Sequence, residues 1–262
     1  MKKLIVNADD FGWSEGINKG IIDCHKNGIV TSTSLLATGQ AYDHAVYLAK
    51  ANPTLSVGVH LNFYRGTPLL ETSDVLYGSI PKLVAYLMIG KVKTSQIEAE
   101  FRAQIDKIIL SGIRPTHLDS EKHVHLLSPK VYKIVKKLSS EYGIKQVRVV
   151  KEPLLGSWKS FVLGLNSSYN TEVGSCGVAY SPTSYVGLER VLRQASRSEQ
   201  AEVELITHPG YLDEEFWQLQ ATIPNKLTYA REEEAKILQS ERARKLVSKY
   251  NFELTSFGVK NI

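Results

Sequence analysis

Carboxylates and histidines gather in four short segments of this chain of 262 residues. The first contains Asp9 and Asp10, the second contains His60, the third runs from His117 to His125, and the fourth contains His208. Adjacent carboxylates repel each other when both are ionised and buried, so the pair requires a cation or a raised pKa. A divalent metal ion is the simplest compensation. A mixed site of imidazole and carboxylate suits zinc and several other transition metals, and it suits magnesium when water completes the shell.

Each segment also has a plainer interpretation. Asp9 and Asp10 are suitable caps for a helix over Ser14–Asn27. His60 alternates with bulky apolar neighbours and therefore points to the opposite face of its strand, where a single histidine is more often a core residue than a ligand. His208 precedes a Pro-Gly turn, which either exposes its ring at a strand end or packs it under Tyr211.

The third segment offers more candidates than one site needs. In an extended chain, alternation puts five of its side chains on one side. Some of them are therefore expected to orient metal ligands through hydrogen bonds instead of binding the metal. The five are His117, Asp119, Glu121, His123 and His125.

Short apolar, β-branched runs alternate with stretches of helical periodicity, which predicts an α/β fold of parallel strands joined by crossover helices. The spacing favours a closed or nearly closed barrel, whose active site lies where the loops after the strands converge. The four segments all follow predicted strands, so we expect them to meet there. We predict seven strands, with Phe252–Ser256 as a candidate eighth: Leu4–Asn7, Val30–Ala37, Ser56–Asn62, Thr116–Ser120, Gln146–Val150, Cys176–Tyr180 and Val203–His208.

Three helices are predicted between or after these strands. The clearest begins after Ser128-Pro129 and stops at Gly143, and the others cover Glu98–Leu110 and Arg231–Tyr250. Leu154–Thr171 is rich in Gly, Ser and Asn and is predicted to be a loop on the substrate side. Without a linker or a low-complexity stretch, residues 1–262 are expected to form a single domain.

The composition excludes several classes of protein. Hydrophobic residues make up 43% and charged residues 23%, which rules out a disordered or fibrous chain. The net charge of +5 is spread along the sequence, so we expect no nucleic-acid partner. Cys24 and Cys176 suit neither a disulfide framework nor a cysteine zinc site. No signal-peptide core or membrane span is evident, and a cytoplasmic location is expected.

The sequence resembles the YdjC-like (ChbG/HpnK) carbohydrate deacetylases, a family related to the NodB-type polysaccharide deacetylases. Five blocks carry the resemblance: IVNADDFG at 5–12, NGIVTST at 27–33, GVHL at 58–61, RPTHLDS at 114–120 and THPG at 207–210. The resemblance implies a distorted (β/α) barrel of about seven parallel strands. It also implies hydrolysis, dependent on one divalent metal ion such as magnesium or zinc, of the N-acetyl group of an amino sugar such as N-acetylglucosamine in chito-oligosaccharides.

The resemblance also implies a ligand set. By position, Asp10 and His60 bind the metal. The third ligand in the family is usually a histidine directly after the Asp-Ser pair, but this chain has Glu121 there. The third ligand is therefore Glu121, His123 or His125, and a glutamate favours a harder, oxygen-loving metal.

The remaining roles follow from the same resemblance. Asp9 is the expected general base, His208 with a near-neutral pKa is the expected proton donor to the leaving amine, and Arg148 is expected to orient an acid. Further candidates for contact with the sugar are the aromatic residues beside the motifs and two residues of the third segment: Trp13, Tyr64, Tyr211, His117 and Asp119.

Several alternatives remain open at this stage. A glycosidase without metal would pair Asp9 or Asp10 with Asp119 or Glu121. A hydrolase acting on a formylated or glycolipid-linked amino sugar would use the same residues, and a silent sugar-binding protein would retain the scaffold alone. A homodimer is also compatible with such a barrel, although no dedicated interface is evident in the sequence.

Overall fold

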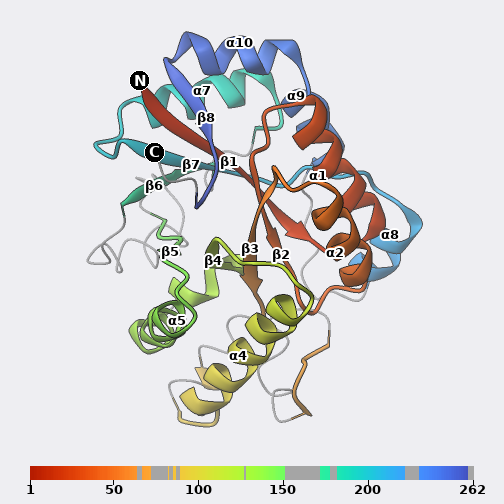
Figure 1. Cartoon of the computed structure of the whole chain (residues 1–262), viewed down its shortest axis with the longest axis vertical. Coiled ribbons are helices and arrows are strands. Elements are labelled where there is room, and N and C mark those ends of the chain that lie inside the picture. Colours follow the sequence, from red (N-terminus) through yellow and green to blue (C-terminus); the bar gives the residue numbers. More distant parts are fainter. Residues whose placement is uncertain are drawn as a thin grey trace.

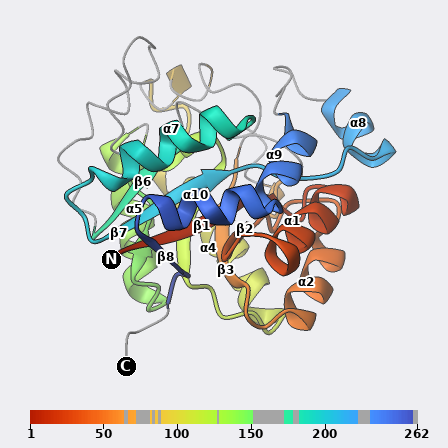
Figure 2. The same ribbon diagram turned by 90° about the horizontal axis from the view of Figure 1, so that it is seen from above.

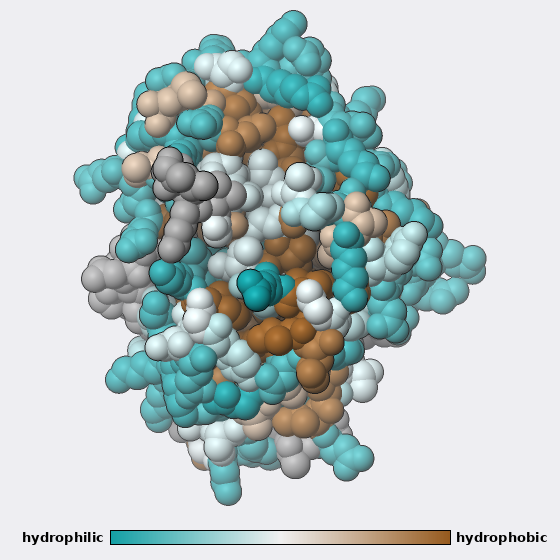
Figure 3. Space-filling view, viewed as in Figure 1, coloured by the Kyte–Doolittle hydropathy of each residue, from teal (hydrophilic) through white to brown (hydrophobic). Residues whose placement is uncertain are grey.

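The computed structural model of the chain is built around a parallel sheet with helices packed outside it (Figure 1). It describes residues 1–63, 67–71, 82, 85–86, 89–126, 128–150, 172–177, 182–221 and 230–258. On the face shown in Figure 3, hydrophilic side chains dominate the margins, and hydrophobic ones gather toward the middle.

The sheet of the described residues has eight strands, in the order β5-β4-β3-β2-β1-β7-β6, and β8 pairs with the first half of β1. All pairings are parallel. The strand predictions are therefore confirmed, including the candidate eighth, except that the one over Cys176–Tyr180 shares only Cys176 with the observed strand. Strand β6 begins three residues before its predicted start, and residues 178–180 of that prediction lie outside the described part. The strands are β1 (Lys2–Phe11), β2 (Ser32–Leu35), β3 (Ser56–Leu61), β4 (His117–Ser120), β5 (Gln146–Val147), β6 (Val173–Cys176), β7 (Glu202–Thr207) and β8 (Phe252–Thr255).

The sheet curls into a half-barrel. Its central strand β1 is apolar on both faces, and Leu4, Ile5 and Val6 are completely buried, as is typical of a parallel strand covered on both sides. At the two ends of the strand order, the Ser175 hydroxyl of β6 donates a hydrogen bond of 3.0 Å to the carbonyl of Val149, just beyond β5. This contact brings the two edge strands near each other, so the ends of the strands face a common centre.

The helices surround this sheet (Figure 2), with α4 against α5, α1 against α2 and α9, and α7 against α10. Side-chain caps from Ser14, Ser128, Ser184 and Ser240 begin four of them. They are α1 (Glu15–Asn27), α2 (Tyr42–Ala51), α4 (Thr94–Leu110), the 3-10 helix η2 (Glu121–Leu126), α5 (Pro129–Glu141), α7 (Tyr185–Ser196), α8 (Glu214–Ala221), α9 (Arg231–Leu238) and α10 (Glu241–Lys249).

The helix predictions are partly confirmed. The helix after Ser128-Pro129 is α5, and the one predicted over Glu98–Leu110 is α4, which begins four residues earlier. The single helix predicted over Arg231–Tyr250 is wrong. The chain leaves the helical conformation at Ser240, whose side chain accepts a hydrogen bond of 3.1 Å from Ala243 N, and two helices result.

Two further predictions concern the loop at Leu154–Thr171 and the membrane span. The loop predicted at Leu154–Thr171 lies outside the described residues. In the described part of the chain, we find no helix with the length and apolar character needed to cross a bilayer.

Candidate functional site

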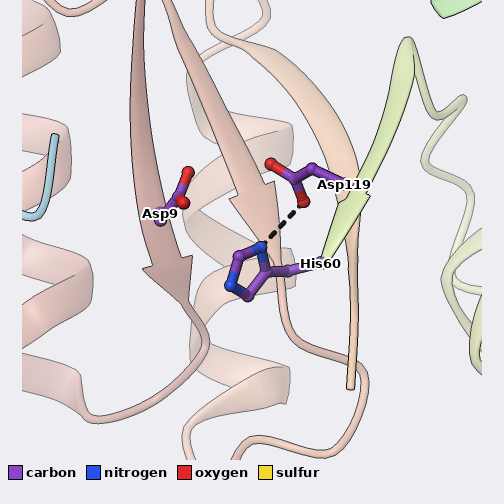
Figure 4. A group of neighbouring side chains, drawn as sticks. All are labelled: Asp9, His60 and Asp119. Atoms are coloured by element: carbon purple, nitrogen blue, oxygen red, sulfur yellow. Dashed lines mark hydrogen bonds and ion pairs between the residues drawn. The ribbon is translucent and has the colours of Figure 1, made fainter. Parts of the chain in front are cut away.

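Buried acids and a histidine converge where β1, β3 and β4 end (Figure 4). Two groups of three side chains share His60, one with Asp9 and Asp119 and the other with Asp10 and Glu121. Within each group, one nitrogen or oxygen atom of every side chain lies within 4.8 Å of the others. The segments that sequence spacing assigned to strand ends therefore do meet.

A bulge in β1 allows both adjacent aspartates to reach this site. Ala8 aligns with Thr33 and Phe11 with Leu35, so β1 advances by three residues where β2 advances by two. Asp10 at the bulge has a φ of 74°, in the left-handed region. On a regular strand, neighbouring side chains point to opposite faces, and a bulge re-aims one of them. Such a φ costs about 1 kcal/mol or more and persists only where the surroundings enforce it.

His60 lies between three carboxylates. Its Nδ1 is 2.7 Å from Asp119 Oδ1, which leaves Nε2 facing Glu121 Oε2 at 3.5 Å and Asp10 Oδ1 at 3.8 Å. Burial lowers the pKa of His60, but Asp119 and Glu121 outweigh burial and hold the pKa well above its usual value. Two carboxylates and one imidazole that face a common point form a donor set that fits a divalent cation.

Arg148 forms the second half of the site. Its guanidinium donates two hydrogen bonds of 2.7 Å to Asp9 and bonds of 2.6–3.1 Å to Glu204, and it pairs with Asp119 at 2.7 Å. The resemblance implied that Arg148 orients an acid without saying which, and here Arg148 contacts Asp9, Glu204 and Asp119. Burial raises the pKa of Glu204 to about 7, against the opposing effect of Arg148. One buried cation thus serves three carboxylates and fixes the carboxylate plane of Asp9.

His208 lies at the end of β7, within reach of Asp9. The distance from its Nε2 to Asp9 Oδ2 is 4.0 Å, and its backbone N donates a hydrogen bond of 2.7 Å to Glu234 Oε2. The near-neutral pKa expected from the sequence is not found. Burial lowers the pKa of His208 to about 4, so the ring is neutral at neutral pH.

The segment after β4 does not continue as a strand. Lys122 and His123 both have positive φ, 53° and 55°, which turns the chain into η2 and breaks the expected alternation. His125 is fully buried and bonds to Ser120 Oγ at 2.5 Å and to the carbonyl of Arg148 at 2.8 Å. Of the three candidates for the third ligand, only Glu121 joins Asp10 and His60 in a group, whereas neither His123 nor His125 does so within the described residues.

Most of the candidates for contact with the sugar do not fit that role. His117 is fully buried, stacks on Phe257 at 4.1 Å and bonds to Ser34 Oγ at 3.1 Å. Asp119 is also fully buried and holds His60, and Trp13 is 2% exposed within the core.

Of the other two aromatic candidates, only Tyr211 belongs to the described residues. Tyr211 donates its hydroxyl to Asp23 at 2.8 Å and packs against the core, and Tyr64 lies outside the described residues. Trp217, which was not a candidate, lies on α8 and is 57% exposed.

Three site residues were missed from the sequence. Ser34 donates to Asp119 Oδ2 at 2.6 Å, and Glu204 holds Arg148. Arg231, at the start of α9, forms a buried ion pair with Asp10. A signal existed for Glu204, because a glutamate inside the apolar run of β7 is an unusual buried charge. The spacing contains no comparable signal for Ser34 or Arg231.

The fold and the site together define a (β/α) half-barrel with a candidate metal centre at its strand ends, and comparisons with known proteins agree with that class. The model of the YdjC-like protein family matches residues 3–249, so the chain belongs to this family. It is 32% identical over 258 residues to a carbohydrate deacetylase of Clostridium beijerinckii, covering 97% of this chain and 98% of the relative. It is 33% identical over 263 residues to a carbohydrate deacetylase of Brevibacillus brevis, covering 98% of each.

Solved structures share the fold. The crystal structure of a candidate cellobiose-phosphate cleavage protein from Enterococcus faecalis matches with a TM-score of 0.80 and 26% identity, over 98% of this chain and 97% of that one. A family 4 carbohydrate esterase from Streptomyces lividans, in complex with acetate, matches with a TM-score of 0.50 and 10% identity, over 97% and 91% of the two chains. The esterase likeness concerns the fold alone.

Proposed function

We propose that this protein is a metal-dependent deacetylase that removes the N-acetyl group of an amino sugar such as N-acetylglucosamine in chito-oligosaccharides, releasing acetate. The observation that carries the proposal is the buried group of Asp10, His60 and Glu121 beside Asp9 and His208. Relatives across the full length that are named carbohydrate deacetylases support the substrate class.

In this proposal Asp10, His60 and Glu121 hold one divalent ion. When bound, such an ion supplies Lewis acidity that lowers the pKa of water and polarises an amide carbonyl. Two of the three donors are oxygens, which favours magnesium or another oxygen-loving metal over a softer one. Asp119 holds the His60 ring through Nδ1 at 2.7 Å, so that Nε2 is available to the ion.

Asp9 and His208 then divide the proton transfers. Asp9, oriented by both nitrogens of the Arg148 fork, accepts a proton from the attacking water. His208 is neutral before the reaction because burial lowers its pKa to about 4. It must gain a proton before it can give one. Asp9 Oδ2, 4.0 Å from His208 Nε2, is the proposed source, and the leaving amine is the acceptor.

The glycosidase without metal finds less support. That mechanism needs one carboxyl group held protonated as an acid. Asp9 and Asp119 instead share Arg148, and Arg148 lowers the pKa of Asp119 against the opposing effect of burial. The histidines of the site would also have no role. A hydrolase for another acylated amino sugar and a silent sugar-binding protein remain outcomes of the test.

The test measures metal content and acetate release from N,N′-diacetylchitobiose on the same purified sample, before and after chelation. We expect chelation to abolish release and metal addition to restore it. Loss of a residue that only hydrogen-bonds to a metal ligand costs roughly 10–100-fold. Asp10→Ala and Glu121→Ala each remove a proposed ligand and should lower activity by more than that. Glu199→Ala, an exposed acid between α7 and β7, is the matched control and should retain full activity.

The other outcomes separate the alternatives. Bound metal without acetate would indicate a different acyl group or sugar, to be sought with formylated and glycolipid-linked amino sugars. Absence of both metal and acetate would overturn the mechanism in favour of a sugar-binding protein.

We further propose that residues 1–262 act as one catalytic domain, which the large apolar core shared by most elements of the described residues supports. Cys24 and Cys176 are both buried, and neither forms a disulfide with a described residue, which agrees with a reducing compartment such as the cytoplasm. A homodimer stays a prediction.

A further inference from the structure

We propose that Arg231 is a positioning residue that holds Asp10 in its metal-facing orientation, and that through Arg231 helix α9 couples the metal-binding half of the site to the loop that carries His208. The proposal rests on the proposed function, since it takes Asp10 as a metal ligand. It extends that function to a residue 221 positions away in the sequence.

The first support is the contact with Asp10. Arg231 is 1% exposed, and its Nη2 donates to Asp10 Oδ2, which leaves Oδ1 to face His60 Nε2 at 3.8 Å. The two oxygens of one carboxylate are thus assigned to different partners. Asp10 also has a left-handed φ of 74°, a conformation that must be enforced by its surroundings. A buried guanidinium is a suitable restraint because its fork has a fixed geometry.

The second support is how Arg231 itself is held. Its Cζ lies 5.7 Å from the centre of the Phe216 ring on α8, within the range of a cation–π contact. Arg231 is the first residue of α9, so the helix fixes the position of its backbone. Arg231 is therefore a restrained group and not a mobile counter-ion.

The third support links α9 to the His208 loop. Arg231 Nη1 donates to the carbonyl of His208 at 3.4 Å, and the carbonyl of Arg231 accepts a hydrogen bond from Gly210 N at 3.3 Å. One turn later, Glu234 accepts from His208 N at 2.7 Å. The first turn of α9 therefore bonds to both the backbone N–H and the carbonyl of His208, the proposed proton donor. Arg231 in the same turn also contacts Asp10, the proposed metal ligand.

The sign of one measurement distinguishes this role from simple charge compensation. If Arg231 mattered only as a nearby positive charge, its removal would strengthen the binding of a cation. If it positions Asp10, its removal should weaken cation binding, as the loss of outer-sphere partners does. The two roles predict opposite changes in affinity.

The experiment titrates metal-free protein with Mn²⁺ alone and follows free Mn²⁺ by electron paramagnetic resonance. We expect Arg231→Met to raise the Kd about tenfold or more. We expect Arg231→Lys, which keeps the charge but loses the fork, to raise it by less. In an Asp10→Asn background, Arg231→Met should add no further loss. Arg193→Met, an exposed arginine on α7, is the control and should bind as the wild type does.

An equal or lower Kd for Arg231→Met would overturn the inference, and so would a further loss in the Asp10→Asn background. If the wild type binds no Mn²⁺, the metal-dependent function is in doubt, and hydrogen exchange on the metal-free protein decides the inference separately. Exchange of the amides of His208, Gly210 and Tyr211 should then be about tenfold faster in Arg231→Met than in Arg193→Met. Equal exchange would overturn the coupling to the loop. Arg231→Lys provides the same comparisons if Arg231→Met fails to fold.

Discussion

His60 depends on a carboxylate that binds Nδ1, the ring nitrogen that is not the proposed metal ligand. Asp119 is fully buried and touches His60, Ser34 and Arg148, so it fixes the ring of one proposed ligand and neutralises part of the neighbouring guanidinium. The same type of residue thus has two roles within one site: Asp10 faces His60 Nε2, whereas Asp119 binds the opposite nitrogen of that ring. Which role each acid takes follows from which nitrogen it meets.

Asp119→Asn tests this role at the scale of single residues. An amide in place of the carboxylate weakens the hold on His60 Nδ1, so the Kd for a divalent metal should rise about 10–100-fold. Metal titration of the apo protein measures it, after circular dichroism shows that the fold is retained. Asp106 is an acid of α4 that bonds to Tyr142, and Asp106→Asn should leave the Kd unchanged. An unaltered Kd in Asp119→Asn would contradict the assignment.

At the scale of elements, α1 holds the His208 loop by close backbone approach. A Cβ added to Gly20 would lie 2.6 Å from Gly210 Cα, and one added to Gly16 would lie 2.4 Å from the carbonyl oxygen of Tyr211. Both atoms belong to the backbone and have little room to yield. Tyr211 N also donates to the carbonyl of Gly16 at 3.1 Å. The glycines of α1 therefore set how near the loop lies to the site.

Gly20→Ala should displace this loop and with it His208. Because a shift of about 1 Å in a reacting group can cost as much as 100-fold in rate, we expect kcat to fall at least about tenfold. Overpacking should also lower the free energy of unfolding by about 1–3 kcal/mol. Acetate release and chemical denaturation measure the two effects. Lys19→Ala, on the exposed face of the same helix, should change neither substantially. Wild-type kcat in Gly20→Ala would show that the loop accommodates the methyl group.

The whole molecule buries several histidines in their neutral form. Burial lowers the pKa values of His117, His125 and His208 to about 4. The unfolded chain binds protons at these residues below about pH 6.5, whereas the folded chain does not, so acid favours unfolding. Glu204 and His60 have the opposite effect, because their raised pKa values, about 7 for Glu204, mean that the folded state binds the extra proton.

The free energy of unfolding should therefore fall between pH 7 and pH 5. Each of the three histidines contributes a loss of about 2 kcal/mol over this interval, and Glu204 and His60 offset part of the sum, by linkage. Urea denaturation at the two pH values measures the difference. His125→Asn should reduce this difference in the free energy of unfolding by about 2 kcal/mol, the contribution of one histidine, provided that the variant folds. Equal stability at pH 5 and pH 7 would show that the buried histidines are protonated without cost.

The sequence by itself determined the parallel strands, helices α4 and α5, and the end of the sheet where the chemistry collects. These features follow from hydrophobic periodicity and capping, which are local patterns. Only the tertiary structure decided that Asp10 faces the same site as Asp9, since that depends on one left-handed φ at a bulge. The turn at Lys122 and His123 likewise separated Glu121 from the two histidines after it. Arg231 meets Asp10 across 221 residues, and contacts at that separation arise from packing, which spacing along a chain does not encode.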